Sequence, residues 1–163
     1  MVDSGKHTMR DKRPLKICLT CAAGGHLTQA IVIASELRKK YPVYFVTYRL
    51  PHFPGDIEGI PTFFVINPCT SYWKYLLNCF QSLKIIIKQR PDVVISTGAG
   101  VAIPTCLLGK LFGAKLIYVE SGSRVTNPSR TGKFLCRFAD LFIVQWPSVK
   151  WAYPKAIIGG PLI

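Results

Sequence analysis

Short apolar runs alternate with longer amphipathic stretches along most of this chain. The runs predict seven strands, over residues 15–20, 43–47, 62–66, 92–96, 115–119, 140–145 and 156–158. The longer stretches predict helices over residues 27–40, 71–90, 101–112 and 132–138. Near-continuous apolar strands that alternate with helices are typical of a parallel sheet covered on both faces. We therefore expect an α/β fold with a doubly wound, Rossmann-like parallel sheet.

Residues 49–61 interrupt this alternation. They contain three prolines and two glycines, a composition that predicts a loop. His52 lies in this loop, and we expect it to face solvent rather than a ligand.

The helix predicted over residues 71–90 has a broad apolar face rich in aromatic side chains, interrupted by lysines at 74, 84 and 88. Such a helix can pack on the sheet. It can also lie at a membrane surface, where apolar burial and attraction to anionic lipid add together. The two interpretations are compatible if they apply to different sides of the helix. For the membrane interpretation, the expected contact residues are Trp73, Leu77 and Phe80.

Two glycine turns are the strongest local signals of a ligand site. Gly24 and Gly25 join the first strand to the first helix, and a second turn runs from Gly98 to Gly100. A helix that begins at such a turn directs free N–H groups and the positive end of its dipole toward the occupant. If strand one lies beside strand four, both turns and Glu120 meet at the topological switch point. An anion is the expected occupant; the alternative is that the first turn is only a tight connection.

The second turn also partly matches a dinucleotide-binding fingerprint, because Glu120 follows Gly98 and Gly100 by about twenty residues. The match is incomplete. Ile103 occupies the third small position, where it would hold the helix away from the sheet, and Pro104 follows it. Dinucleotide binding is therefore the less favoured alternative, and we expect no cofactor.

The six cysteines do not form a pattern of metal ligands. Cys18 and Cys21 form a C-x-x-C motif in or at the end of the first strand, and no second Cys/His pair follows at zinc spacing. The chain also has no secretory signal, so we expect reduced, mostly buried thiols and no metal site.

The size and the charge limit what the domain can do. A chain of 163 residues, 49% hydrophobic, is too short for two nucleotide-binding domains, so we expect one domain over residues 15–163 after a disordered basic tail over 1–14. The net charge is +13, and beyond Gly59 twelve Lys/Arg face only Asp92, Glu120 and Asp140. Such a surface favours anionic lipid head groups or phosphorylated substrates.

Several separate segments, in order and spacing, resemble one known family from about Lys16 to the C-terminus. They are Ala22-Ala23-Gly24-Gly25-His26-Leu27-Thr28, Ser96 to Pro104, Ile117 to Ser121 with Arg124-Val125, Ser129 to Lys133 with Leu135, and Val144 to Pro147 with Tyr153-Pro154-Lys155. The sequence thereby resembles the PssD/EpsE group of bacterial polysaccharide proteins. It also resembles the related eukaryotic membrane-anchoring subunit of the dolichol-linked N-acetylglucosamine transferase.

This resemblance implies the N-terminal, acceptor-binding half of an inverting GT-B glycosyltransferase such as MurG. The half that binds the nucleotide sugar would be a separate polypeptide, so the chain alone would be inactive. The implied reaction moves a sugar from a UDP-sugar to a polyprenyl-diphosphate-linked acceptor on the cytoplasmic face of the membrane. The chain ends near Gly160, close to where a two-domain enzyme would cross to its donor domain. The expected partners are a donor-binding subunit, the lipid-linked acceptor and the membrane, and not nucleic acid.

Eukaryotic members of this family carry an N-terminal membrane anchor that the present sequence lacks. We therefore expect either a prokaryotic member held by peripheral contact or a chain from which an anchor has been trimmed.

Attack by a sugar hydroxyl requires a base that takes its proton. His26 and Glu120 are the candidate catalytic residues, with His26 as base or diphosphate contact and Glu120 as its partner or as the base itself. For Glu120 a purely hydrogen-bonding role remains an alternative, as does a polar loop role for His26. The residues expected to bind the acceptor diphosphate are Gly24, Gly25, Thr97, Gly98, Ala99, Gly100, Ser121 and Arg124. A second hypothesis makes the protein a catalytically silent anchor that recruits and activates its partner.

Overall fold

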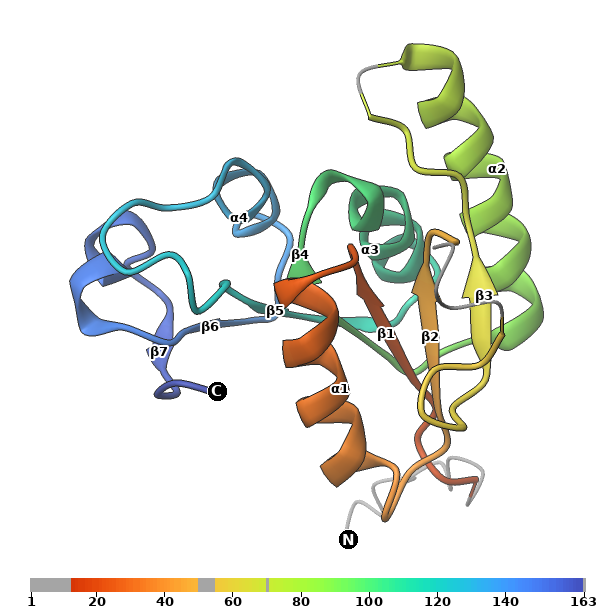
Figure 1. The fold of residues 1–163 in the computed structure, drawn as a ribbon, viewed down its shortest axis with the longest axis horizontal. Coiled ribbons are helices and arrows are strands. Elements are labelled where there is room, and N and C mark those ends of the chain that lie inside the picture. The colour runs from red at the N-terminus through yellow and green to blue at the C-terminus, as the bar shows by residue number, and fades with distance from the viewer. Residues whose placement is uncertain (1–12, 50–54, 70, 163) are drawn as a thin grey trace, which may run out of the picture.

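The computed structural model of the chain describes residues 13–49, 55–69 and 71–162 (Figure 1). Nearly all of the tail predicted over residues 1–14 lies outside these ranges, and so does His52.

Seven parallel strands form one sheet in the order β3-β2-β1-β4-β5-β6-β7. Their bounds are β1 Ile17–Cys21, β2 Val43–Thr47, β3 Thr62–Phe64, β4 Val93–Gly98, β5 Lys115–Val119, β6 Leu141–Val144 and β7 Ile157–Ile158. The doubly wound sheet predicted from the sequence is confirmed, including the pairing of β1 with β4 that places the topological switch point between them.

Helices cover both faces of the sheet (Figure 1). They are α1 Gly25–Leu37, α2 Tyr72–Gln89, α3 Ile103–Leu111 and α4 Arg130–Leu135, with 3-10 turns η1 Gly100–Ala102 and η2 Pro147–Ala152. On one face, Leu27, Ala30 and Ala34 of α1 pack with alternate residues of β1 and β2. On the other face, α3 and the segments around α4 and η2 bury the opposite set of strand residues.

Several predictions of local structure need correction. The fourth strand runs on to Gly98, beyond the predicted end at residue 96, and the helix predicted over 101–112 divides into η1 and α3. The short helix predicted over 132–138 begins two residues earlier, because the hydroxyl of Ser129 caps it by accepting the N–H of Gly132 at 2.8 Å. The turn η2 was not predicted.

Cys18 and Cys21 point to opposite faces of the sheet, since Cys18 packs with the α3 side and Cys21 with the α1 side. Burial raises the pKa of the Cys21 thiol to about 12. The two thiols therefore cannot bind one metal ion together, and each behaves as a small apolar core residue.

Helix α2 directs two polar residues, Asn78 and Ser82, toward the protein, whereas most of its large apolar residues face outward. Asn78 and Ser82 are fully buried, and Asn78 Nδ2 donates to the carbonyl of Ile66 at 2.8 Å. Ser82 donates to Asn78 Oδ1 and shares a 3.0 Å hydrogen bond with Thr105 of α3. The exposed large apolar residues of the helix form what we call the α2 stripe: Tyr72, Trp73, Leu76, Leu77, Phe80 and Ile87. Packing of these residues on the sheet is therefore excluded, although Ile86 on the inner side is buried.

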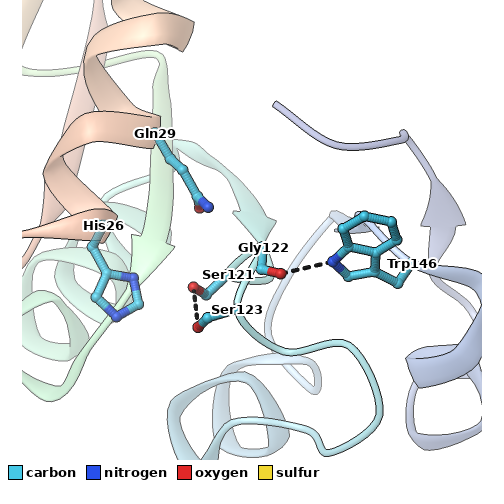
Figure 2. Close-up of a pocket in the computed structure, with 7 residues that line it drawn as sticks. His26, Gln29, Ser121, Gly122, Ser123 and Trp146 are labelled. Atoms are coloured by element: carbon cyan, nitrogen blue, oxygen red, sulfur yellow. Dashed lines mark hydrogen bonds between the residues drawn. The ribbon is translucent and has the colours of Figure 1, made fainter. Parts of the chain in front are cut away.

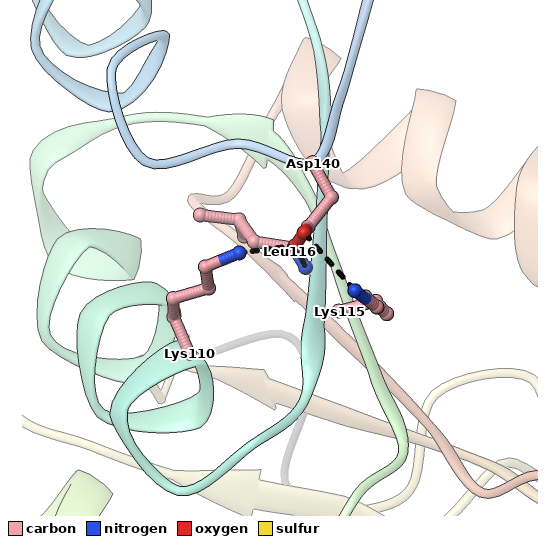
Figure 3. A network of polar contacts seen from close by, with 4 residues as sticks. All are labelled: Lys110, Lys115, Leu116 and Asp140. Atoms are coloured by element: carbon pink, nitrogen blue, oxygen red, sulfur yellow. Dashed lines mark hydrogen bonds and ion pairs between the residues drawn. The ribbon is translucent and has the colours of Figure 1, made fainter.

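At the end of the sheet opposite the glycine turns, Asp140 joins α3 to β5 (Figure 3). Its Oδ2 accepts from Lys110 Nζ at 2.6 Å and from the backbone N–H of Leu116 at 2.8 Å, and its Oδ1 lies 3.4 Å from Lys115 Nζ. The hydrogen bond from Lys110, then that from Leu116, and the two lysine charges lower the pKa of Asp140 to about 2.

Asp140→Asn is expected to lower the free energy of unfolding at pH 7 by about 1 kcal/mol, a value reduced for solvent screening of the lysine pairs. A lowered carboxyl pKa stabilises the fold above the unfolded value near 4. That stabilisation disappears as the pH falls toward 2, so the urea midpoints of wild type and variant should converge there. Lys115→Met, which removes the more exposed lysine, should change the free energy of unfolding by less than about 0.5 kcal/mol. A constant difference between Asp140→Asn and wild type across this pH range would contradict the assignment.

Candidate functional site

A pocket of about 420 Å³ opens at the carboxyl ends of the strands. The residues that line it come from the start of α1, the loop after β5 and the second position after β6: Gly25, His26, Gln29, Ser121, Gly122, Ser123 and Trp146. Figure 2 shows that His26 and Gln29 approach this space from α1, with the 121–123 loop between them and Trp146. The pocket thus lies where ligands bind in open α/β sheets.

His26 is held by the second glycine turn. Its Nδ1 lies 2.7 Å from the carbonyl oxygen of Thr97, and Thr97 Oγ1 donates to the carbonyl of His26 at 2.8 Å. Because a carbonyl only accepts, Nδ1 must carry the proton in this contact, which leaves Nε2 of the neutral ring as a free acceptor. The ring is therefore arranged to receive a proton or to bind a polar group at Nε2.

Gly98 makes the close approach of the two turns possible. Its φ is +117°, and a β-carbon there would lie 3.0 Å from both His26 Cε1 and the hydroxyl of Tyr118. A side chain at this position would push the imidazole away. On the far side of the same turn, the hydroxyl of Tyr75 on α2 donates to the carbonyl of Gly100 at 2.9 Å. The second turn is therefore contacted by His26 on one side and by Tyr75 of α2 on the other.

Glu120 is buried, with 1% of its surface exposed, and both of its carboxylate oxygens are occupied. Oε1 accepts the backbone N–H of Ser121 at 3.0 Å. Oε2 accepts the N–H and the hydroxyl of Ser129 at 3.1 and 3.0 Å, and the hydroxyl of Tyr153 as well. Burial and the adjacent carboxylate raise the pKa of Tyr153, so the phenol stays protonated as a donor. This geometry favours the hydrogen-bonding role for Glu120, since its carboxylate does not line the pocket.

The structure brings together only part of the predicted diphosphate site. Gly25 and Ser121 line the pocket, and Thr97 and Gly98 support His26 from behind. Gly24, Ala99, Gly100 and Arg124 do not line it; Arg124 is exposed at the end of the 121–124 turn, where its N–H donates to the carbonyl of Ser121. The diphosphate-binding roles of all eight residues remain predictions.

Four pocket residues were not singled out from the sequence: Gln29, Gly122, Ser123 and Trp146. Gln29 lies three residues after His26 on α1 and so faces the same side of the helix, a spacing that could have identified it. Trp146 donates from Nε1 to the carbonyl of Gly122 at 2.7 Å, a contact between β5 and β6 loops that sequence spacing does not reveal.

Comparison with known proteins adds an independent observation. The family described as "Oligosaccharide biosynthesis protein Alg14 like" matches residues 66–162. The UDP-N-acetylglucosamine transferase subunit ALG14 of Rattus norvegicus is 34% identical, over 96% of this chain and 87% of the relative. A relative from Christiangramia forsetii is 28% identical over 91% of this chain and 45% of its own length. Its name describes an N-acetylglucosamine transferase that acts on N-acetylmuramyl-(pentapeptide) pyrophosphoryl-undecaprenol.

Two solved structures share the fold. MurG of Acinetobacter baumannii superposes with a TM-score of 0.69 and 21% identity, over 83% of this chain and 43% of that one. UDP-N-acetylglucosamine 2-epimerase of Rickettsia bellii superposes with a TM-score of 0.75 and 14% identity, over 92% and 46%. The present chain spans less than half of either, and at these identities the likeness concerns the fold alone.

Proposed function

The chain belongs to the Alg14-like family of oligosaccharide biosynthesis proteins, and from this premise we propose that it is the acceptor-binding subunit of a two-subunit glycosyltransferase. This membership confirms the resemblance inferred from the sequence motifs. The proposed reaction moves N-acetylglucosamine from its UDP derivative to a polyprenyl-diphosphate-linked saccharide. The relatives named as transferase subunits and the relative that acts on pyrophosphoryl-undecaprenol support this choice of donor and acceptor.

The observation that carries the proposal is the pocket at the switch point. Free N–H groups at the start of α1 and the hydroxyls of Ser121 and Ser123 are donors suited to phosphate oxygens. His26 Nε2 is available beside them to take the proton of the attacking sugar hydroxyl. In this arrangement the hydroxyl oxygen bonds to the anomeric carbon, UDP leaves with the bonding electrons, and the proton passes to the imidazole.

We place the UDP-sugar site on a separate donor-binding subunit. The ALG14 relatives are named as subunits of a transferase, and the described residues of this chain form one Rossmann-like sheet with its pocket at the carboxyl ends of the strands. Alone, the chain is therefore proposed to be inactive, and the assembled enzyme to invert the anomeric configuration.

The α2 stripe supports peripheral membrane contact. Trp73, Leu77 and Phe80 are 78%, 53% and 64% exposed, and lysines 74, 84 and 88 flank them in solvent. Within the described residues, none of the helices combines the length and apolarity needed to cross a bilayer. Tyr75, a neighbour of the stripe on α2, donates to the carbonyl of Gly100, so α2 contacts the second glycine turn, and the carbonyl of Thr97 just before that turn holds His26. We place the membrane contact on the cytoplasmic face.

Trp73→Ser is expected to reduce binding to vesicles that contain anionic lipid at least fivefold, because it removes the largest exposed apolar side chain of the stripe. Flotation of the chain with phosphatidylglycerol-containing and pure phosphatidylcholine vesicles measures this. Trp151→Ser is the matched control, since Trp151 is 69% exposed but lies on η2. Equal flotation of both variants would contradict membrane contact through α2.

The reaction is tested by expressing the chain with the donor-binding subunit from the same organism and supplying UDP-N-acetylglucosamine and a short-chain polyprenyl-diphosphate sugar. Sugar transfer by the pair, with no transfer by either subunit alone, is the expected result. Transfer that needs no polyprenyl diphosphate would overturn the proposal.

The exposed α2 stripe also favours a second candidate function, that of a silent anchor that recruits the catalytic partner. Under that hypothesis, substitutions in the pocket leave turnover intact, whereas substitutions in the stripe abolish membrane recruitment of the partner. Measuring both properties in the same variants separates the two functions.

A further inference from the structure

Two buried amides lie beneath the loop that lines the pocket. Gln29 on α1 is 3% exposed, and Gln145, the residue after β6, is 2% exposed. Gln145 Nε2 donates to the carbonyl of Glu120 at 2.9 Å and to Gln29 Oε1 at 3.3 Å. Its Oε1 accepts the backbone N–H of Leu162 at 2.9 Å. One side chain therefore joins three segments that are far apart in the sequence.

The 121–123 loop rests directly on this amide pair. A β-carbon at Gly122 would lie 2.8 Å from Gln29 Nε2 and 3.0 Å from Gln145 Oε1, so nothing larger than glycine fits without a shift. From the other side, Trp146 Nε1 holds the carbonyl of Gly122 at 2.7 Å (Figure 2). The loop is thus fixed between the amides and the indole.

We propose that Gln145 is a positioning residue for the acceptor pocket, which sets the position of the 121–123 loop relative to α1. This inference rests on the proposed function, because it takes the pocket as the acceptor site. Every polar atom of the Gln145 head group has a partner, so its removal leaves Gln29, the Glu120 carbonyl and the Leu162 N–H without theirs. The loop then relaxes, and a displacement near 1 Å at a reacting site is enough to slow a reaction by about 10²-fold.

Gln145→Met tests this, because methionine keeps the length of the side chain and removes its polar atoms. Hydrogen exchange of the amides of residues 121–124 in the chain alone should accelerate about tenfold. In the complex with the donor-binding subunit, KM for a short-chain polyprenyl-diphosphate N-acetylglucosamine should rise about tenfold, while KM for UDP-N-acetylglucosamine stays within twofold. Gln89→Met is the matched control: its Oε1 accepts from Lys16 far from the pocket, and neither quantity should change.

Two further variants keep the test decisive if Gln145→Met does not fold. Gln145→Glu retains the acceptor for Leu162 and loses both donors, so loop exchange should again accelerate. Trp146→Phe removes only the second tether of the loop and should accelerate exchange about threefold. Where Gln145→Met folds, the double variant with Gln29→Met should show no more than the larger single effect, since the two amides act as one unit.

Unchanged loop exchange in a folded Gln145 variant would overturn the proposal. It would also be overturned if kcat fell and both KM values rose to the same extent, together with a lower unfolding midpoint. The exchange measurement needs no acceptor. Failure of the wild-type complex to use the polyprenyl diphosphate would therefore refute the proposed function while leaving the positioning of the loop separately measured.

Discussion

Replacing His26 by asparagine is expected to slow sugar transfer by the two-subunit enzyme by about 10²–10⁴-fold, the usual contribution of a general base. Asparagine can keep a donor near the position of Nδ1, and therefore the hydrogen bond to the Thr97 carbonyl, but it has no atom at the position of Nε2. The loss should therefore appear in kcat, with the unfolding midpoint unchanged. Single-turnover assays with saturating acceptor measure the chemical step directly.

His26→Ala provides the comparison, because alanine loses both the base and the contact with Thr97. It should be as slow as the asparagine variant and somewhat less stable, by about 0.5–1.5 kcal/mol for the lost hydrogen bond. Turnover at the wild-type rate in the asparagine variant would remove His26 as the base and leave the silent-anchor function as the better account.

Glu120→Gln is expected to lower the free energy of unfolding by about 2–4 kcal/mol. The carboxylate accepts from Ser121, Ser129 and Tyr153, and an amide would point a donor at one of these groups. Denaturation by urea, followed by circular dichroism, measures the change. Tyr153→Phe removes a single donor and should cost less than half as much.

The same variant distinguishes the two roles considered for Glu120. A catalytic base replaced by its amide would lose turnover at wild-type stability. If Glu120 instead holds α4 and Tyr153 in place, the variant protein should be less stable than wild type. Below its unfolding temperature, sugar transfer should then fall only to the extent that the 121–123 loop moves. Wild-type stability together with lost turnover would restore the catalytic role.

Much of the fold was predictable because the strands are buried on both faces. Short continuous apolar runs such as residues 43–47 and 115–119 are typical of buried parallel strands, and β2 and β5 have the predicted bounds. The turn after β4 was less predictable. The strand continues to Gly98, and Ala99, the residue before the 3-10 turn, adopts a positive φ of 77°. A positive φ is expected at glycine rather than at alanine, so the sequence did not indicate where the turn begins.

The orientation of α2 could not be read from its periodicity. The hydrophobic pattern marks one face, but whether that face meets the sheet or the exterior depends on what the polar face can bind. Asn78 binds the carbonyl of Ile66, in the segment after β3, and Ser82 binds the hydroxyl of Thr105 on α3, so both polar groups are satisfied without water. Such partners come from distant segments and leave no local signal.

In the candidate site, too, some features follow from the local sequence and others depend on contacts between distant segments. That His26 and Gly25 line the pocket was predictable, because a strand–glycine–helix junction directs its free N–H groups toward the carboxyl end of the sheet. The burial of Glu120 was not predictable, since an acid after a buried strand can face the ligand or the interior. Its partner Tyr153 lies 33 residues downstream, and only the fold brings the two side chains together.

The hydrogen bond between Ser82 of α2 and Thr105 of α3 has a consequence for the proposed membrane contact. Two helices that are held together only by the hydrophobic effect lose this driving force when acyl chains replace the water around them, because lipid tails are as apolar as leucine side chains. The hydroxyl contact of Ser82 with Thr105, and that of Asn78 with the carbonyl of Ile66, would persist in that medium, since the alternative there is an unsatisfied polar group. For the proposed membrane contact, we therefore expect α2 to enter the leaflet while it stays attached to the rest of the domain.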